Sequence, residues 1–344
     1  MESHTMNYKE VTQLFRPDLD KVERALKDNF LSDIPIVPGI GEYIMSSGGK
    51  RIRPLLMLIG ARLCGLELND ALIKHCCVIE NVHAATLLHD DVVDETTVRR
   101  GRQTVNSKWG NDASILVGDY LIAQSLTLLS DDVNPAIFKA FSKAAKLLVE
   151  GGLLEFSNAR DIHVTEKHCM DVIYRKTASI LSLSCQLGGL IAEADQEQEE
   201  ALLAFGEHFG MAFQLMDDLM DYDSTPEKLG KPAGNDFQEG HVTLPLHHLY
   251  HHSKNGLKQE IEEFIQNDKL TSKELDYILD RMREGKALEY TLDQAHKHMD
   301  RAKESIQTTT FPKPEYKNAL LAVADYILSR HTLSKATLAN STQF

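Results

Sequence analysis

The chain has 344 residues, of which 42% are hydrophobic and 26% are charged, and its formal net charge is −14 at pH 7. A chain of this length and composition can bury a large core, which excludes an intrinsically disordered protein. The acidic balance argues against a nucleic-acid-binding protein, because phosphate backbones are bound by extended basic surfaces and this chain has only short basic clusters.

The cysteines and the apolar segments indicate in which cellular compartment the protein works. Five cysteines occur in apolar helical contexts without metal-ligand spacing: Cys64, Cys76, Cys77, Cys169 and Cys185. This odd number is typical of reduced core residues, so we expect no disulfide framework and a cytoplasmic location. Arg62 interrupts the most apolar segment, residues 54–68, and the N-terminus has no signal-peptide core. We therefore expect no transmembrane segment.

Hydrophobic residues recur with the 3.6-residue period of a helix in nearly every segment, and the alternation of a strand is almost absent. We predict an all-α fold in a single large domain over residues 1–344, with residues 1–7 as an N-terminal extension. The first helix covers residues 8–29, and a link with proline and glycine follows at residues 34–41. A shorter helix then leads to Ser46. Further predicted helices cover 54–64, 69 or 70 to 94, 135–158, 167–194 and 196–221, and one begins at the Thr271–Glu274 capping box.

One of these helices ends in the acidic stretch His89-Asp90-Asp91-Val92-Val93-Asp94. Asp90 and Asp94 lie one turn apart on one face, about 6 Å along the helix axis. The carboxylates repel each other, and a helix C-terminus already disfavours negative charge. A solvated acidic helix end would explain one such cluster by itself.

A second cluster, Asp217-Asp218-Leu219-Met220-Asp221, repeats the pattern at the end of another apolar helix. If the two acidic turns face one cavity, they can hold Mg2+, which takes one or two carboxylates and completes its octahedron with water and phosphate oxygens. The two clusters together indicate a phosphate-bearing ligand bridged by metal.

Basic residues lie near both elements. Gly48-Gly49-Lys50-Arg51-Ile52-Arg53-Pro54 places cations at a helix start, where free backbone N–H groups attract anions. Arg99-Arg100-Gly101-Arg102 follows the first acidic turn, and arginine binds diphosphate oxygens bidentately. Both have plainer interpretations, a solvated basic turn and neutralisation of the aspartates. His83 by itself is typical of a hydrogen-bonded core histidine.

Five motifs in this order resemble the signature of the trans-isoprenyl diphosphate synthases of the long-chain, octaprenyl or heptaprenyl type. They are residues 48–54, residues 87–94 with Arg99-Arg100-Gly101, Gly118-Asp119-Tyr120, Arg175-Lys176-Thr177-Ala178, and Gln214-Leu215-Met216-Asp217-Asp218 with Gly230-Lys231. Each motif is moderately specific, but five in the family order are very specific. They span most of the chain, from about Tyr43 to Leu246.

The resemblance implies the isoprenoid synthase fold, a helical bundle around a deep central cavity, and a Mg2+-dependent prenyltransferase. An allylic diphosphate would ionise, isopentenyl diphosphate would attack the allylic carbon, and a proton would be lost. By position in the family pattern, several Mg2+ ions would be held by Asp90, Asp91, Asp94, Asp217, Asp218 and Asp221. Isopentenyl diphosphate would be held by Lys50, Arg53, His83 and Arg100, and the allylic diphosphate would be contacted by Arg99 and Lys231. The allylic cation would be faced by Lys176, Thr177 and Gln214.

The resemblance also implies a homodimer and suggests how product length is set. A growing prenyl tail would run down a groove beneath the first acidic turn, past Ala85, Thr86 and Val82. Short-chain relatives that resemble farnesyl synthases carry aromatic rings near this point, whereas small residues leave the groove open. We therefore expect a hexaprenyl to decaprenyl product for quinone side chains. The structural alternative for Ala85 is close packing of helices.

Two departures from the family pattern bear on product length or rate. His241 stands where many relatives have a second lysine, and an unperturbed histidine is mostly neutral at pH 7. Gly152 and Glu155 stand where many long-chain relatives have glutamate and glutamine.

Several other functions compete with this one. A geranylgeranyl or farnesyl diphosphate synthase would share the motifs, and so would a catalytic subunit that needs a small partner chain. A terpene cyclase usually has asparagine and serine in its second metal motif, which Asp217-Asp218-Leu219-Met220-Asp221 lacks. A regulatory subunit would lose aspartates or lysines, and a helical scaffold would need neither Lys176 nor Gln214.

Overall fold

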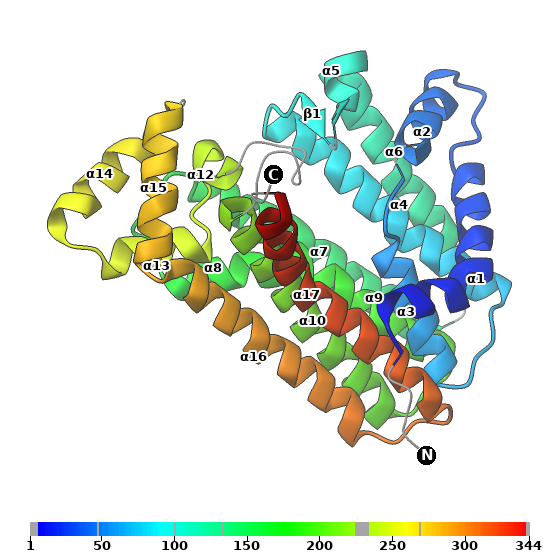
Figure 1. Cartoon of the computed structure of the whole chain (residues 1–344). Helices are drawn as coiled ribbons and strands as arrows, with labels where there is room; N and C mark the ends of the chain where they lie inside the picture. The colour runs from blue at the N-terminus through cyan, green and yellow to red at the C-terminus, as the bar shows by residue number, and fades with distance from the viewer. Residues whose placement is uncertain are drawn as a thin grey trace. The chain divides into compact units, whose positions relative to one another are not determined.

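The structure is a computed structural model of the chain. It describes residues 6–46, 48–99, 101–132, 134–223, 234–267 and 270–341, with side chains up to residue 331. These residues are almost entirely helical (Figure 1), which confirms the predicted all-α fold.

The chain divides into two compact units, each built from separate stretches of sequence. Unit 1 comprises Met1–Lys143, Ile180–Gly206 and Ser305–Val323. Unit 2 comprises Ala144–Ser179, Glu207–Glu304 and Ala324–Phe344. Every boundary falls inside a helix, and the single domain expected from the sequence stays a prediction.

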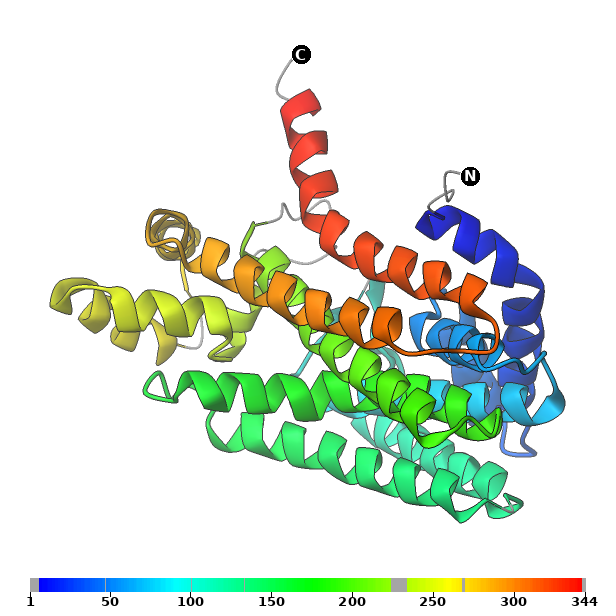
Figure 2. The same cartoon turned by 90° about the horizontal axis from the view of Figure 1, so that it is seen from below.

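The first part of the chain forms α1 (Tyr8–Asp28), α2 (Ile36–Ser46), α3 (Ile52–Leu63), α4 (Asp70–Val93), β1 (Val98–Arg99), β2 (Arg102–Gln103), α5 (Val105–Trp109) and α6 (Asn111–Ser130). The rest, which Figure 2 shows from below in green to red, forms α7 (Pro135–Ser157), α8 (Glu166–Ile173), a π-helical segment (Tyr174–Ala178), α9 (Ser179–Ile191), α10 (Gln196–Asp223), α12 (Asn235–Glu239), α13 (Leu244–His252), α14 (Asn255–Ile265), α15 (Ser272–Glu284), α16 (Ala287–Thr308), a 3-10 turn (Pro314–Tyr316) and α17 (Lys317–Ser341).

The predicted helix starts follow from capping chemistry. The Asn69 side chain accepts a hydrogen bond from the Leu72 N–H, and this satisfies one of the free N–H groups of α4. Thr271 and Glu274 form the predicted reciprocal capping box of α15. These two starts are confirmed.

Two predicted boundaries are wrong. The link at residues 34–41 is shorter, because α2 begins at Ile36 and places Pro38 in its first turn, where the missing N–H is not needed. The predicted helix at 167–194 ends at Ile191 and is interrupted by the π-helical segment Tyr174–Ala178.

In unit 1 the core packs α2, α4, α5 and α6 together. The α4 side chains Ala85 and Leu88 are buried against Val37 of α2 and against Val117 and Leu121 of α6. The Ser114 hydroxyl of α6 donates to the Leu88 carbonyl oxygen at 2.8 Å, so the two helices approach closely. This packing fixes the helix that carries the first acidic turn.

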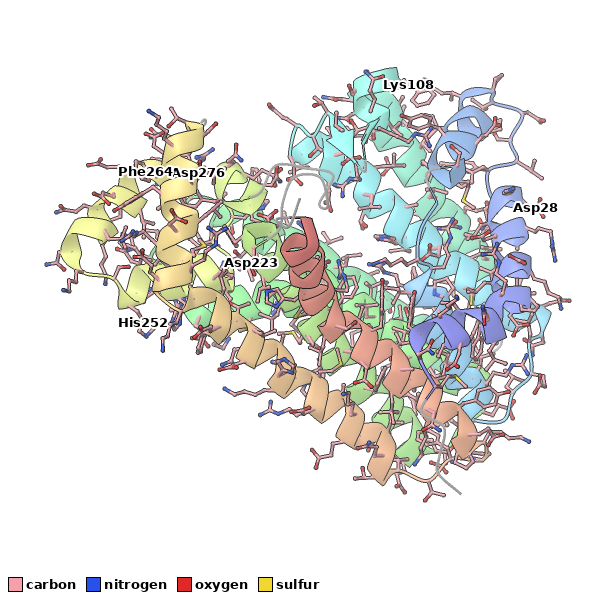
Figure 3. The ribbon with its side chains drawn as sticks, viewed as in Figure 1. Asp28, Lys108, Asp223, His252, Phe264 and Asp276 are labelled. Atoms are coloured by element: carbon pink, nitrogen blue, oxygen red, sulfur yellow. The ribbon has the colours of Figure 1, made fainter. Side chains whose placement is uncertain are left out.

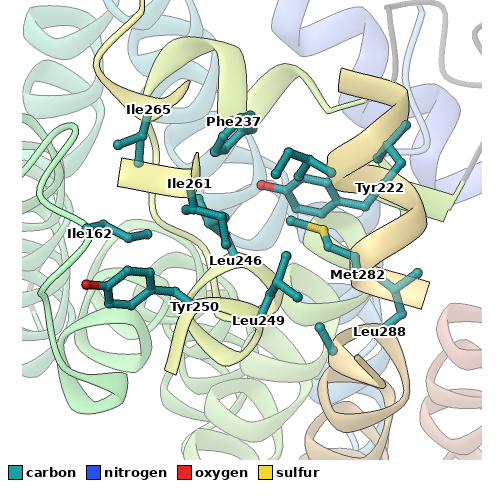
Figure 4. Close-up of a cluster of buried hydrophobic side chains, with 13 residues drawn as sticks. Ile162, Tyr222, Phe237, Leu246, Leu249, Tyr250, Ile261, Ile265, Met282 and Leu288 are labelled. Atoms are coloured by element: carbon teal, nitrogen blue, oxygen red, sulfur yellow. The ribbon is translucent and has the colours of Figure 1, made fainter. Parts of the chain in front are cut away.

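In unit 2 a second core supports short helices (Figure 4). Tyr222 near the end of α10 packs with Phe237, Leu246, Ile261 and Met282 of α12 to α15. Helices of five to thirteen residues, such as α12 to α15, are marginal alone. The cluster therefore stabilises them and anchors the end of α10, which carries the second acidic turn.

Among the described helices, α6 is long and apolar enough to cross a membrane by length and composition alone. This is weak evidence, since core helices of soluble proteins have the same composition, and Ser114 and Ser125 of α6 are fully buried. The expected absence of a transmembrane segment stays a prediction.

Candidate active site

The first acidic turn lies at the end of α4 in unit 1. Asp90 and Asp94 are partly exposed, whereas Asp91 is only 5% exposed. The Asp94 N–H donates to the Asp90 carbonyl oxygen at 2.8 Å and closes the helix. Two of the three carboxylates therefore stand one turn apart where a ligand can reach them.

The buried carboxylate of this turn holds an arginine. Arg99 Nε donates to Asp91 Oδ1 at 2.8 Å. Burial raises the pKa of Asp91, and the charge and hydrogen bond of Arg99 oppose that shift. The two-residue strands β1 and β2, joined through Gly101 at φ +73°, return the chain so that Arg99 lies beside the helix end. This is the neutralising role that the sequence also allowed for Arg99.

His89 of the same turn is oriented by α6. Its Nε2 lies 3.1 Å from the Ile115 carbonyl oxygen and 3.5 Å from Asp119 Oδ1. A Cβ at Gly118 would lie 2.2 Å from that nitrogen, so a larger residue would displace the ring from this position. The Gly118-Asp119 motif therefore supports the first acidic turn.

The predicted phosphate-binding cations have different surroundings. Arg51 donates to Glu80 at 2.7 Å and serves a structural ion pair. Lys50 is exposed, and Arg53 and His83 are partly exposed. All belong to unit 1 with the first acidic turn. Arg100 and Lys231, two further predicted cations, lie outside the described residues.

The second acidic turn lies near the end of α10 in unit 2. Asp217 is partly exposed, while Asp218 and Asp221 are almost fully buried. Burial raises the pKa of Asp218 to about 7, and the hydrogen bond from Gln214 opposes the shift. Asp221 accepts a hydrogen bond from the Asp236 N–H at 3.0 Å. Both turns therefore combine accessible and buried carboxylates. Two are accessible in the first turn and one in the second, and the buried ones hold neighbouring groups.

The predicted residues Lys176 and Thr177 lie in the π-helical segment, a geometry that is frequent at functional sites. Two glycines of adjacent helices allow it. A Cβ at Gly151 of α7 would lie 2.7 Å from the Lys176 backbone nitrogen, and one at Gly210 of α10 would lie 2.5 Å from Ala178 Cα. Close backbone approach from both helices therefore accommodates the wider turn.

The side chains of this segment join a polar network. Lys176 Nζ donates to the carboxylate of Glu155. Thr177 Oγ1 donates to Gln214 Oε1 at 2.7 Å, and Gln214 Nε2 donates to Asp218 Oδ1 at 2.7 Å. The structure thus brings Lys176, Thr177 and Gln214 together with a buried aspartate of the second acidic turn.

The sequence reasoning missed two residues of α17. Arg330 donates to Asp217 Oδ1 at 2.6 Å, and the His331 ring nitrogen lies 2.7 Å from Asp223 Oδ2. Asp223 is labelled in Figure 3, near the end of α10. Arg330 and His331 follow the last recognised motif by more than eighty positions, so no local pattern indicated the contact.

The residues expected to set product length differ in exposure. Ala85 is fully buried in the core of unit 1, and Val82 is 2% exposed. Thr86, one turn before Asp90, is partly exposed, and its hydroxyl donates to the His83 carbonyl oxygen at 2.9 Å. Thr86 therefore shares the accessible face of α4 with Asp90 and His83.

Among the described residues, one group of three metal-ligand side chains has donor atoms within 4.8 Å of one another: Asp236, Glu239 and His241. Neither aspartate triplet forms such a group in the described part of the chain. Mg2+ commonly takes only one or two protein carboxylates, so its binding does not require such a group of three.

The comparisons with known proteins agree with the motifs. The sequence profile of one family, described as Polyprenyl synthetase, matches residues 35–282. The chain is 36% identical to the octaprenyl diphosphate synthase of Escherichia coli over 94% of its own length and 99% of that protein. It is 33% identical to heptaprenyl diphosphate synthase component 2 of Bacillus subtilis, over 94% of this chain and 91% of that protein.

A solved structure gives the same result for the fold. The polyprenyl synthase of Caulobacter crescentus, complexed with calcium and isoprenyl diphosphate, matches with a TM-score of 0.89 and 33% identity, over 95% of this chain and 99% of that one. The chain therefore belongs to the polyprenyl synthetase family and is a prenyltransferase of the long-chain polyprenyl diphosphate synthase type.

Proposed function

We propose that this prenyltransferase condenses isopentenyl diphosphate head-to-tail onto an allylic diphosphate with Mg2+ as its metal. The observation that carries the proposal is the matched exposure of the two acidic turns, in which Asp90, Asp94 and Asp217 are accessible and Asp91 and Asp218 are buried. Use of a divalent metal is supported by the calcium in the related Caulobacter structure.

The accessible carboxylates fit Mg2+, because proteins usually bind this ion through one or two carboxylate oxygens. Asp90 and Asp94 would hold metal in unit 1, and Asp217 would do so in unit 2. Bound magnesium would supply the positive charge that stabilises a leaving diphosphate. Asp91, Asp218 and Asp221 would act mainly by holding their hydrogen-bonded neighbours.

The predicted cations would bind the diphosphate groups of the substrates. Lys50, Arg53, His83 and Arg100 would hold isopentenyl diphosphate, and Arg99 would contact the allylic diphosphate together with Lys231. Arg99 is kept in place by Asp91 at 2.8 Å, so it offers an oriented guanidinium. An arginine ordered before binding loses less conformational entropy when the anion arrives.

The polar network of unit 2 would face the allylic cation. The chain of hydrogen bonds from Thr177 through Gln214 to Asp218 fixes the orientation of the amide and hydroxyl dipoles. The ammonium group of Lys176 by itself would repel a developing carbocation. Its ion pair with the carboxylate of Glu155 balances that charge. Fixed dipoles of this kind stabilise charge without reorganisation during the reaction.

We propose a product of hexaprenyl to decaprenyl length, used for quinone side chains. Small or modest side chains on α4, Thr86 at the accessible face and Val82 behind it, would leave room for a long tail. The curated relatives named above make octaprenyl and heptaprenyl diphosphates, which agrees with this range.

We also propose a cytoplasmic homodimer. Helix α6 presents Ile115 and Leu116 to solvent at 40% and 66% exposure, and Phe138 of α7 is 48% exposed. Apolar side chains of this size are typical of a helix face that a partner covers. The heptaprenyl relative is named as one component of an enzyme, so a small partner chain is the second arrangement to test.

The test is incorporation of labelled isopentenyl diphosphate into an extractable prenol by the purified chain. The proposal expects incorporation that needs both Mg2+ and an allylic primer, and that stops when the metal is chelated. Incorporation that persists after chelation would contradict the metal assignment. Activity that appears only after a second protein is added would replace the homodimer with a heteromeric enzyme.

A further inference from the structure

Helix α13 carries four histidines in two pairs that the proposed reaction does not use. The segment His247-His248-Leu249-Tyr250-His251-His252 places His247 with His251 and His248 with His252, each pair one helical turn apart. Figure 3 labels His252 at the end of this helix in unit 2. Paired imidazoles one turn apart on a helix form a chelate for transition metals.

The first pair has the features of a ligand site. The rings of His247 and His251 lie 4.3 Å apart between centroids and are tilted by 40°. His247 is only 8% exposed, and its Nδ1 has no hydrogen-bond partner among the described residues. A buried imidazole nitrogen without a partner is costly, so a ligand from outside the described residues would stabilise this atom. His251 is exposed, which opens the pair to solvent.

The second pair is arranged differently. The rings of His248 and His252 are stacked at 4.0 Å with 21° between their planes, and Tyr290 of α16 stacks on His248 at 4.2 Å. His252 Nδ1 lies 2.9 Å from the His248 carbonyl oxygen, so that nitrogen is already hydrogen-bonded to the backbone. This pair serves packing and is the natural control for the first.

The surroundings of His247 keep its ring uncharged near neutral pH. Burial lowers the pKa of His247 to about 4, and the neighbouring histidines lower it further, while Glu166 of α8 opposes them. Glu166 itself accepts a hydrogen bond from the Tyr290 hydroxyl at 2.8 Å. A neutral imidazole keeps its lone pair for a metal, so protons compete little at His247.

We propose that His247 and His251 form a site for a first-row transition-metal ion such as Zn2+ or Ni2+, with water completing the coordination on the exposed side of His251. Imidazole nitrogen suits these ions, whereas Mg2+ prefers carboxylate and phosphate oxygens. The site is therefore chemically distinct from the acidic turns. It lies on a helix that packs into the core of unit 2, so a bound ion would stabilise that unit.

The test is calorimetric titration of the full chain with ZnCl2 in the presence of saturating Mg2+, which keeps the carboxylates of the acidic turns occupied. Wild type and His252→Ala should bind Zn2+ alike. His251→Ala, at an exposed position, should weaken the affinity by about ten-fold or more, as loss of groups at metal sites does. Thermal melts should show Zn2+ raising the Tm of wild type and His252→Ala but not of His251→Ala.

A third variant separates this site from the group Asp236, Glu239 and His241. His241→Asn removes the only nitrogen ligand of that group and should leave the Zn2+ affinity unchanged. Equal affinity in wild type and His251→Ala would overturn the proposal. Loss of binding in His241→Asn but not in His251→Ala would assign the ion to the other group, and absence of Zn2+ binding by wild type would also overturn it.

Discussion

Aspartates that look equivalent in the sequence differ in what their carboxylates touch. Asp90 and Asp94 are accessible, and Asp91 one residue away is buried against Arg99. In the second turn Asp217 is accessible, and Asp218 accepts a hydrogen bond from the Gln214 side-chain amide. Each turn therefore combines accessible carboxylates, which we propose as metal ligands, with buried ones that hold the groups beside them.

This division predicts different effects for neighbouring substitutions. Asp90→Asn should abolish Mg2+-dependent turnover with little change in Tm, because it removes one charge from a repelling cluster. Asp91→Asn should keep measurable turnover and raise the KM for the allylic diphosphate, because Arg99 loses a charge-assisted bond worth about 1.5–3 kcal/mol. Steady-state kinetics and circular dichroism melts measure both. Equal losses of turnover would show that the two carboxylates share one role.

Arg330 makes a second prediction at this scale. It donates to Asp217 at 2.6 Å, so an ion at Asp217 must displace or share that contact. Arg330→Gln should therefore tighten Mg2+ binding at the second acidic turn, as measured by calorimetry without substrate. Arg283→Gln, which alters the longer 3.9 Å contact with Asp223, is the matched control and should change the affinity less. Weaker Mg2+ binding in Arg330→Gln would mean that the arginine orients the carboxylate for metal.

At the scale of the helix, α4 has a buried face and an accessible face. Ala85 lies in the core with Val117 and Leu121 of α6, which is the helix crowding considered as its structural alternative. Its part in setting product length stays a prediction. Thr86 lies on the accessible face with Asp90 and is the better candidate for the groove wall.

We therefore expect Thr86→Phe to shorten the product, because a ring would block the passage of later isoprene units. Ala85→Phe should instead lower stability by about 1–3 kcal/mol through overpacking. Chromatography of the dephosphorylated products and denaturant unfolding of both variants distinguish the two outcomes. A shortened product from Ala85→Phe at unchanged stability would show that its side chain faces the tail after all.

How far the sequence predicts an element depends on how local its cause is. Asn69 and Thr271 cap helices through bonds three residues away, and both starts are predictable. The π-helical segment depends on Gly151 and Gly210, which are distant in sequence and permit close backbone approach. No local pattern encodes that packing, so the sequence predicts a continuous helix there.

The same distinction applies to the candidate site. The motifs identified Asp90, Asp217 and Lys176 because each motif is a short, contiguous pattern. The burial that separates Asp91 from Asp90 depends on Arg99 and the hairpin that carries it. The Arg330 contact depends on α17 returning to α10, a long-range event that the sequence does not reveal.

For the whole molecule, the clustered histidines predict loss of stability in mild acid. Burial lowers the pKa of His247 and of His298 to about 4 from the ordinary 6.5, and the pKa of His208 and His248 also falls. His298 and His208 face each other with Nδ1 atoms 3.1 Å apart, near Arg301 and Glu207. The unfolded chain therefore binds protons more readily than the folded chain between these pKa values.

The sign follows from that difference. Stability contributed by the neutral histidines is fully present above about pH 6.5 and is lost as the pH falls towards 4. Urea unfolding should show a lower free energy of unfolding near pH 5 than near pH 7.5, a range in which most carboxylates remain charged. His298→Asn should reduce this slope. Asp218, whose pKa burial raises to about 7, changes the stability in the opposite direction, so the decisive comparison is between wild type and His298→Asn. An equal slope in the two proteins would show that His298 is charged in the folded protein.

The chain length of the product tests the central account most directly. The measurement is the size of the dephosphorylated prenols that the purified chain makes from farnesyl diphosphate, labelled isopentenyl diphosphate and Mg2+, without any other protein. We predict all-trans products in the hexaprenyl to decaprenyl range. Products that stop at geranylgeranyl diphosphate, or no extension at all by the chain alone, would contradict it.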